Sequence, residues 1–169
     1  MKKKLKNFLS IPLRAWRSRG FGVHSPFAFR FITEVIRCPH GYYAYPAIGS
    51  SAAARRLYRI ILALAPEKVI VTGPLSDSLA VAVSLAKAEA QAAPHRDKLA
   101  VVPPEAIVGI SYLRSILAAG GAVVFTNIQN AGCAEIFAEI APCGMTFAGL
   151  RQAVVVGGNL PRQQFPVLI

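Results

Sequence analysis

The residues best suited to hold a ligand follow a short β-branched run at residues 68–72, Lys-Val-Ile-Val-Thr. Gly73 comes directly after it, and Ser76 and Asp77 stand where a helix is expected to begin. A glycine lets a backbone approach a ligand closely, and free N–H groups at a helix start attract anions. Asp77 disfavours a phosphate at this position by repulsion, whereas a ribose or an amine remains a possible ligand. The alternative for these side chains is helix capping alone.

A second set of polar side chains follows the most apolar run of the chain, residues 122–126. Thr126, Asn127 and Gln129 stand at its end, and ligands of open α/β sheets bind at the carboxyl ends of strands. These neutral groups can donate and accept hydrogen bonds, but they cannot act as general bases at neutral pH. The sequence therefore assigns no catalytic residue.

Two further candidates lie nearer the N-terminus. His24 is suited to act as a base or to contact a phosphate, or else to hydrogen-bond backbone and hold its segment on the core. Tyr43 lies in an aromatic loop with Tyr42 and Tyr45. Such rings stack on adenine or a nucleic-acid base, or they cover a hydrophobic edge.

Several classes of site are excluded by residue type. The chain has no phosphate-binding P-loop, no serine–histidine–aspartate spacing and no paired carboxylates, and we predict no metal site. Three widely spaced cysteines, Cys38, Cys133 and Cys143, are expected to be free, mostly buried thiols in a reducing compartment. No apolar stretch reaches the about 18 residues of a membrane span, and the apolar region of a signal peptide is missing. We expect a cytoplasmic protein.

Positive charge is concentrated at the N-terminus. The formal net charge is +11, and the first 37 residues carry nine lysines and arginines against one acid, Glu34. Residues 2–19 form a basic amphipathic pattern. This pattern predicts contact with nucleic acid or an anionic membrane. The alternative is a solvated basic arm.

Strand-like and helix-like segments alternate along most of the chain. Ser25 and Pro26 are typical of a helix start. Expected helices cover residues 26–37, 50–65, 77–93, 105–119 and 134–140, and expected strands cover 68–72, 98–102, 122–126, 145–156 and 165–169. In the helix over residues 50–65, the apolar face is expected to hold Leu57, Ile60, Ile61 and Leu64, and the polar face Arg55, Arg56 and Arg59. Alternation of this kind favours a mostly parallel sheet, and the last two strands are expected to form an antiparallel hairpin through the turn at residues 157–159.

The segment Gly22-Val23-His24-Ser25-Pro26-Phe27 resembles the N-terminal extension of a group of bacterial S-adenosylmethionine (SAM)-dependent methyltransferase-like proteins. The resemblance implies a Rossmann-like α/β core over residues 67–169, with a basic helical extension over residues 1–66 packed on it as one compact domain. It also implies a SAM site near Gly73, Ser76, Asp77, Thr126 and Asn127, and substrate contacts near His24, Tyr43 and Gln129. The terminal hairpin would be the reversed final strand of the family's sheet.

The chain departs from that family at the cofactor positions. Thr72 stands where an acid is expected, and Pro74 removes a backbone donor beside the single glycine, Gly73. Thr126 and Asn127 replace an acidic pair. Residues 93–99 leave no room for the ribose-binding strand, so about one βαβ unit is absent. We therefore expect weakened or lost SAM binding.

Three functions stay open on this basis. The first is a diverged SAM-dependent methyltransferase, since methyl transfer can proceed by alignment alone. The second is a non-catalytic binding or assembly module, including a homo-oligomer that covers an exposed sheet edge. The third is nucleic-acid or anionic-membrane binding through the basic segment.

Overall fold

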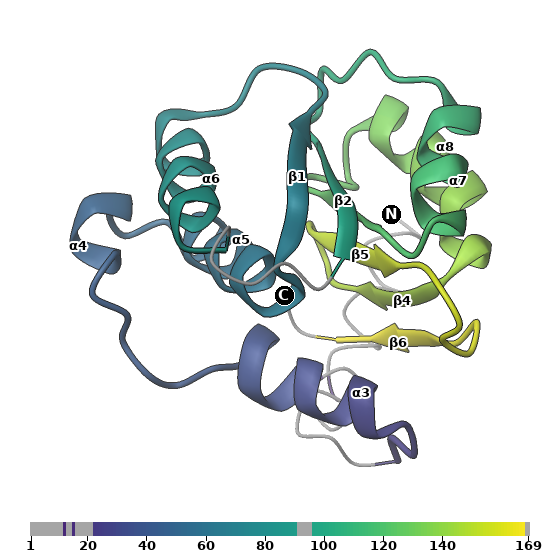
Figure 1. Ribbon diagram of the computed structural model, residues 1–169, viewed down its shortest axis with the longest axis horizontal. Helices are drawn as coiled ribbons and strands as arrows, with labels where there is room; N and C mark the ends of the chain where they lie inside the picture. The colour runs from purple at the N-terminus through teal and green to yellow at the C-terminus, as the bar shows by residue number, and fades with distance from the viewer. Residues whose placement is uncertain (1–11, 13–14, 16–21, 91–95, 168–169) are drawn as a thin grey trace.

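The computed structural model describes residues 12, 15, 22–90 and 96–167 of the 169 (Figure 1). Most of the basic segment, residues 2–19, lies outside this part of the chain, as do the expected helix end at residues 91–93 and the last two residues. Binding of nucleic acid or an anionic membrane by the basic segment therefore stays a prediction.

One six-stranded sheet forms the centre of the molecule. Its strands are β1 (Pro66–Val71), β2 (Arg96–Val102), β3 (Ala122–Phe125), β4 (Met145–Ala148), β5 (Ala153–Val156) and β6 (Gln164–Pro166). Their spatial order is β1-β2-β3-β5-β4-β6. Only β5 runs against its neighbours. The expected mixed α/β fold with a mostly parallel sheet is confirmed.

Helices cover both faces of the sheet. Helices α5 (Ala52–Leu64) and α6 (Asp77–Ala90) lie on one face, and α7 (Ile110–Ala118) and α8 (Ala131–Ile140) lie on the other (Figure 1). Successive strand residues point to opposite faces: Leu99 and Val101 join the α5–α6 cluster, whereas Ala100 and Val102 join the α7–α8 cluster. A sheet covered on both faces explains why residues 122–125 are apolar throughout.

The N-terminal helix begins as predicted. The Ser25 side chain accepts a hydrogen bond from the Ala28 amide at 3.3 Å, and Pro26 is the first residue of α3 (Pro26–Arg30). The helix continues as the π-helical η1 (Phe31–Ile36). The Phe31 ring lies 4.7 Å from that of Phe147 on β4, centroid to centroid. This contact places the segment beside the β4–β6 side of the sheet. The next short helix, α4, covers Tyr45–Ile48.

Helix α5 confirms its predicted apolar face, because Leu57, Ile60, Ile61 and Leu64 are all buried. Arg59, which was expected on the polar face, is also buried, at 9% exposure. Its burial is possible because backbone carbonyls and a tyrosine hydroxyl accept hydrogen bonds from the guanidinium. The prediction for Arg59 was wrong because sequence periodicity does not reveal these distant acceptors.

Two helices begin elsewhere than expected. Helix α7 begins at Ile110, with Gly109 as its N-cap, instead of at residue 105. Residues 103–109 form a loop that begins with the proline pair directly after β2. Helix α8 begins at Ala131 instead of residue 134, because the Asn130 side chain caps it through the Cys133 amide.

The prediction for the C-terminal strands was wrong in connectivity. Residues 145–156 form two strands, β4 and β5, joined by a tight turn in which the Gly149 amide bonds to the Gln152 carbonyl at 2.8 Å. The antiparallel hairpin is therefore β4–β5. Strand β6 pairs with β4 in parallel instead of with β5. The run after Val156 passes β4 before β6 begins, so residues 157–159 do not close a hairpin.

Candidate functional site

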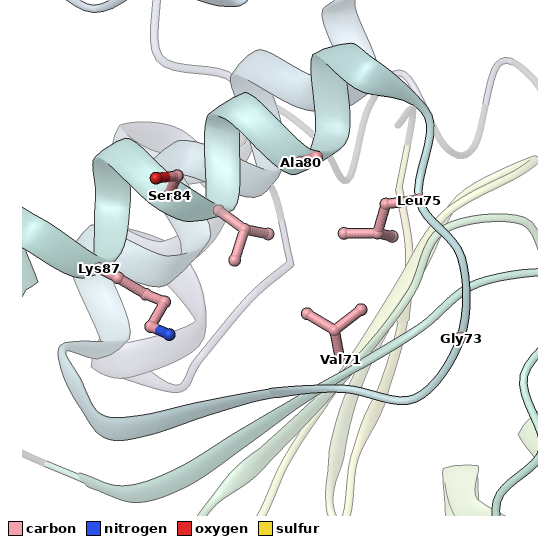
Figure 2. A pocket seen from close by; sticks show the side chains of 7 residues that line it. Val71, Gly73, Leu75, Ala80, Ser84 and Lys87 are labelled. Carbon is pink, nitrogen blue, oxygen red and sulfur yellow. The ribbon is translucent and has the colours of Figure 1, made fainter.

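A groove of about 440 Å³ lies between the end of β1 and helix α6 (Figure 2). The groove is open on one side because β1 is the edge strand of the sheet and no further described strand covers the space between β1 and α6. The side chains of Val71 and Leu75 point into the groove. The full lining is Val71, Gly73, Leu75, Ala80, Val83, Ser84 and Lys87.

The groove is apolar with one cation. Lys87 projects from α6 at one end of it (Figure 2). No acid lines the groove, and among the described residues Lys87 has no ion-pair partner. Val71 is 41% exposed although it belongs to a strand. Such a surface suits an apolar group that carries an anion at one end, and it offers no proton-transfer group except an amine.

The other flank of Gly73 is filled by the chain itself. A β-carbon on Gly73 would lie 3.1 Å from Ala106 Cα, 3.1 Å from Pro103 Cγ and 3.2 Å from the Glu105 carbonyl oxygen. The loop at residues 103–109 is tied down there, because the Ile107 amide bonds to the Thr72 carbonyl at 3.3 Å. The glycine therefore permits close packing of this loop.

The loop is also held from the α8 side. The Cys133 thiol, buried in α8, donates to the Pro103 carbonyl at 3.2 Å, and burial raises its pKa. Cys133 is therefore a packed thiol. Cys38 and Cys143 are partly exposed, and all three cysteines are free, as expected.

Ser76 and Asp77 lie outside the groove. Both are exposed, and Asp77 is the first residue of α6. The Ser76 carbonyl accepts the hydrogen bond from the Ala80 amide. Of the predicted cofactor residues, only Gly73 therefore lines the groove.

A polar cluster at the end of β3 involves two residues that sequence reasoning did not select, Arg56 and Gln152. Gln152 is 2% exposed; its side chain accepts from Arg56 Nη1 at 2.5 Å and donates to the Ala53 carbonyl at 3.2 Å. Continuing the β3–β5 register places Gln152 opposite Thr126, so their side chains share the α5 face. No pattern in the sequence near either residue indicates this pairing, which joins positions 96 residues apart.

Two buried atoms of this cluster have no hydrogen-bond partner among the described residues, Arg56 Nε and Thr126 Oγ1. Desolvation and then the charge of Arg59 lower the pKa of Arg56 to about 10. Burial destabilises the charge, and no ion pair with a carboxylate offsets this among the described residues. Thr126, a predicted cofactor residue, therefore belongs to the cluster that holds Arg56 and does not line the groove.

Asn127 and Gln129 stabilise the loop after β3. The Asn127 side chain accepts from the Gln129 amide at 3.1 Å, and the Gln129 side chain donates to the Leu150 carbonyl at 3.1 Å. Neither lines the groove. Their polar groups are engaged in holding this loop against the β4–β5 turn.

His24 lies at the opposite end of the sheet. It is exposed and shares a hollow of about 240 Å³ with Gly22, Gln163, Gln164 and Phe165. Gln164 begins β6, whose direction matches β4 and hence β3. The hollow is therefore at the amino edge, whereas Gly73 and Thr126 follow carboxyl ends.

Tyr43 is 78% exposed, and a hydrogen bond with Glu89 on α6 raises its pKa. Its neighbours Tyr42 and Tyr45 pack against the buried Tyr58, with ring centroids 5.7 and 6.4 Å from it. The Tyr58 hydroxyl contacts both Glu89 carboxylate oxygens at 2.8 Å. The aromatic loop is thus attached to α5 and α6, apart from the groove lining.

No group of three metal-ligating side chains occurs among the described residues, and none of the helices described is long and apolar enough to cross a membrane. Comparisons with protein-family models, with curated proteins and with solved structures find no match to this chain. The function therefore has to be argued from the groove and its surroundings.

Proposed function

We propose that this chain is a methyltransferase-like α/β module, shortened by about one βαβ unit, that has lost its cofactor and acts by binding a partner. The observation that carries this proposal is the packing of Pro103, Glu105 and Ala106 on Gly73. The glycine that would let a cofactor approach instead lets a loop of the same chain approach.

The sheet supports the proposed origin. Parallel strands β1, β2 and β3 are followed by a reversed strand, β5, beside β3. In a doubly wound sheet, strands extend to both sides of the first strand. Here β1 pairs only with β2 among the described strands, which fits the absence of the unit that would lie on its other side.

The groove residues do not fit SAM. The molecule carries a sulfonium and an ammonium cation, one carboxylate and two ribose hydroxyls, and a protein carboxylate is the usual acceptor for the cations and the hydroxyls. The charged residue of the lining is instead Lys87, the Ser84 hydroxyl is a neutral acceptor, and the apolar side chains of Val71, Leu75 and Val83 provide none. Asp77, the acid closest in sequence to Gly73, is exposed at the start of α6.

The groove favours a binding role over an enzymatic one. A strand edge with a partly exposed valine and an adjoining apolar groove is a surface that proteins normally cover. The diverged-methyltransferase alternative needs SAM to bind close to Gly73. The binding module and the diverged methyltransferase therefore differ in whether the chain binds SAM, which can be measured.

Calorimetric and thermal-shift titrations with SAM and S-adenosylhomocysteine test the proposal. A ligand that binds only the folded state raises the melting temperature by mass action. We expect neither heat nor a shift up to millimolar ligand. A dose-dependent shift that is reduced by Gly73→Val would overturn the proposal and support the enzyme.

A further inference from the structure

We propose that a second copy of this chain covers the outer edge of β1, with the two β1 strands paired antiparallel and Lys87 of each copy facing Glu67 of the other. This inference rests on the proposed binding function and names its partner. We refer to the outer side of residues 67–71 as the β1 edge.

The backbone of the β1 edge is available for pairing. The Thr72 amide donates to Val101 on β2, and the Thr72 carbonyl accepts from Ile107. Because alternate residues of a strand direct their polar groups to the same side, Val69 and Val71 direct theirs away from β2. No described strand lies there.

Charge selects the register of an antiparallel pair. Centring the pair on Lys68 would set two ammonium groups directly opposite, which destabilises a sheet. Centring it on Val69 removes that conflict. Val69 then lies opposite Val69 of the second copy, and Glu67 lies opposite Val71.

This register brings opposite charges to the same groove. Glu67, Val69 and Val71 alternate with Lys68 and Ile70, so the Glu67 side chain lies on the α6 face with Val71. Val71 and Lys87 line one groove (Figure 2). Glu67 of the second copy, opposite Val71, therefore lies at the Val71 side of the groove, and the Lys87 side chain extends toward it from the other end (Figure 2). Neither side chain has an ion-pair partner among the described residues, and both are exposed.

The self-complementarity of this edge favours a second copy as the partner. A two-fold axis at Val69 uses each Glu67 and each Lys87 once, so a single surface supplies both charges and both halves of the hydrogen-bond ladder. The same operation sets the two grooves side by side and covers both Val71 side chains. A partner of different sequence would need to supply all of these features independently.

Sedimentation equilibrium on the full chain measures the outcome. We expect a mass twice the 18.1 kDa of the monomer at tens of micromolar protein in physiological salt, where repulsion between the +11 charges is screened. Glu67→Lys and Lys87→Glu should each weaken dimerisation about tenfold. The double variant, E67K with K87E, should restore it.

Val71→Lys, which places a charge in the groove, should give a monomer, whereas Phe29→Lys on α3 should not, although Phe29 is similarly exposed at 45%. Melting curves of each variant report whether it folds. If Val71→Lys does not fold, the exposed charge-swap variants Glu67→Lys and Lys87→Glu still test the inference. A monomeric wild type, or single variants that the double variant fails to restore, would overturn the inference. The titration with SAM and the measurement of mass are independent experiments. A monomer that does not bind SAM would therefore contradict the dimer and leave the proposed function unaffected.

Discussion

Gly73 and Ala106 are packed so closely that a β-carbon on Gly73 would lie 3.1 Å from the Ala106 α-carbon. This contact joins the loop after β1 to the loop after β2. These are two of the loops at the carboxyl ends of the parallel strands, where α/β folds bind ligands. The chain thus closes on itself at a position where a nucleotide-binding protein would stay open.

Replacing Gly73 by alanine should therefore destabilise the fold. The added methyl group meets backbone atoms and must displace the loop at residues 103–106, which costs about 1 kcal/mol or more. Gly41→Ala is the matched control, because nothing lies within 4 Å of its β-carbon position, and its effect should stay within about 0.5 kcal/mol. Urea denaturation measures both. Equal stabilities would mean that the loop does not rest on Gly73.

The two buried threonines should respond oppositely to valine. Thr146 Oγ1 donates to the Ala141 carbonyl at 2.8 Å, so Thr146→Val should lower the free energy of unfolding by about 1–2 kcal/mol. Thr126 Oγ1 has no partner among the described residues. Thr126→Val should therefore leave stability unchanged or raise it by up to about 1 kcal/mol.

Chemical denaturation of the two threonine variants measures whether their free energies of unfolding change in opposite ways. A large loss for Thr126→Val would show that this hydroxyl has a partner, for example an ordered water, and would return Thr126 to the candidate ligand residues. The same loss in both variants would contradict the difference that we expect.

The local elements were predictable because their determinants are local. Ser25 caps α3 through an amide three residues away, and the α5 stripe repeats with the helical period. The strand at residues 122–125 was evident from its unbroken apolar character. In each case the sequence signal and the structural cause lie within a few residues.

The candidate site was less predictable because its contacts are distant in sequence. Gln152 meets Arg56 across 96 residues, and no pattern near either residue indicates the pairing. The split of residues 145–156 depends on a turn inside a continuous apolar stretch, so periodicity alone favoured one strand. Strand order, which makes β1 an edge, is not encoded in any single segment.

Tyr58 should make stability depend on alkaline pH. Burial, and then its hydrogen bond to Glu89, raises the pKa of Tyr58 above the usual tyrosine value of 10.0. The folded state keeps the phenolic proton while the unfolded chain loses it, so this contribution is complete below about pH 10 and declines as pH rises further.

Tyr58→Phe removes this dependence. Its free energy of unfolding should be lower than that of the wild type at pH 8, and the difference should shrink between pH 10 and 11.5. Denaturation at several pH values measures it, and Tyr112→Phe, an exposed tyrosine on α7, is the control. A difference that stays constant over this range would show that Tyr58 ionises equally in both states.

Arg59 and Arg56 lie one turn apart on α5 and should differ sharply on replacement. The Arg59 guanidinium donates to the Val35 carbonyl, the Ile36 carbonyl and the Tyr45 hydroxyl at 2.6, 2.9 and 2.6 Å. Arg59→Met leaves the carbonyls at the end of η1 without a donor, and it should cost about 3 kcal/mol. Arg59→Lys should recover only part of this, because an ammonium cannot span all three acceptors.

Arg56→Met is the matched comparison on the same helix. It loses one bond, to Gln152, but it also removes a buried charge whose pKa is lowered by desolvation. We expect its stability to stay within about 1 kcal/mol of the wild type, since the two effects oppose each other. Because Arg59 joins η1 and the tyrosine loop to α5, Arg59→Met should also expose the segment at residues 31–45 to proteolysis, whereas Arg56→Met should not. Equal losses in the two variants would mean that burial of charge, and not the three hydrogen bonds, determines the role of Arg59.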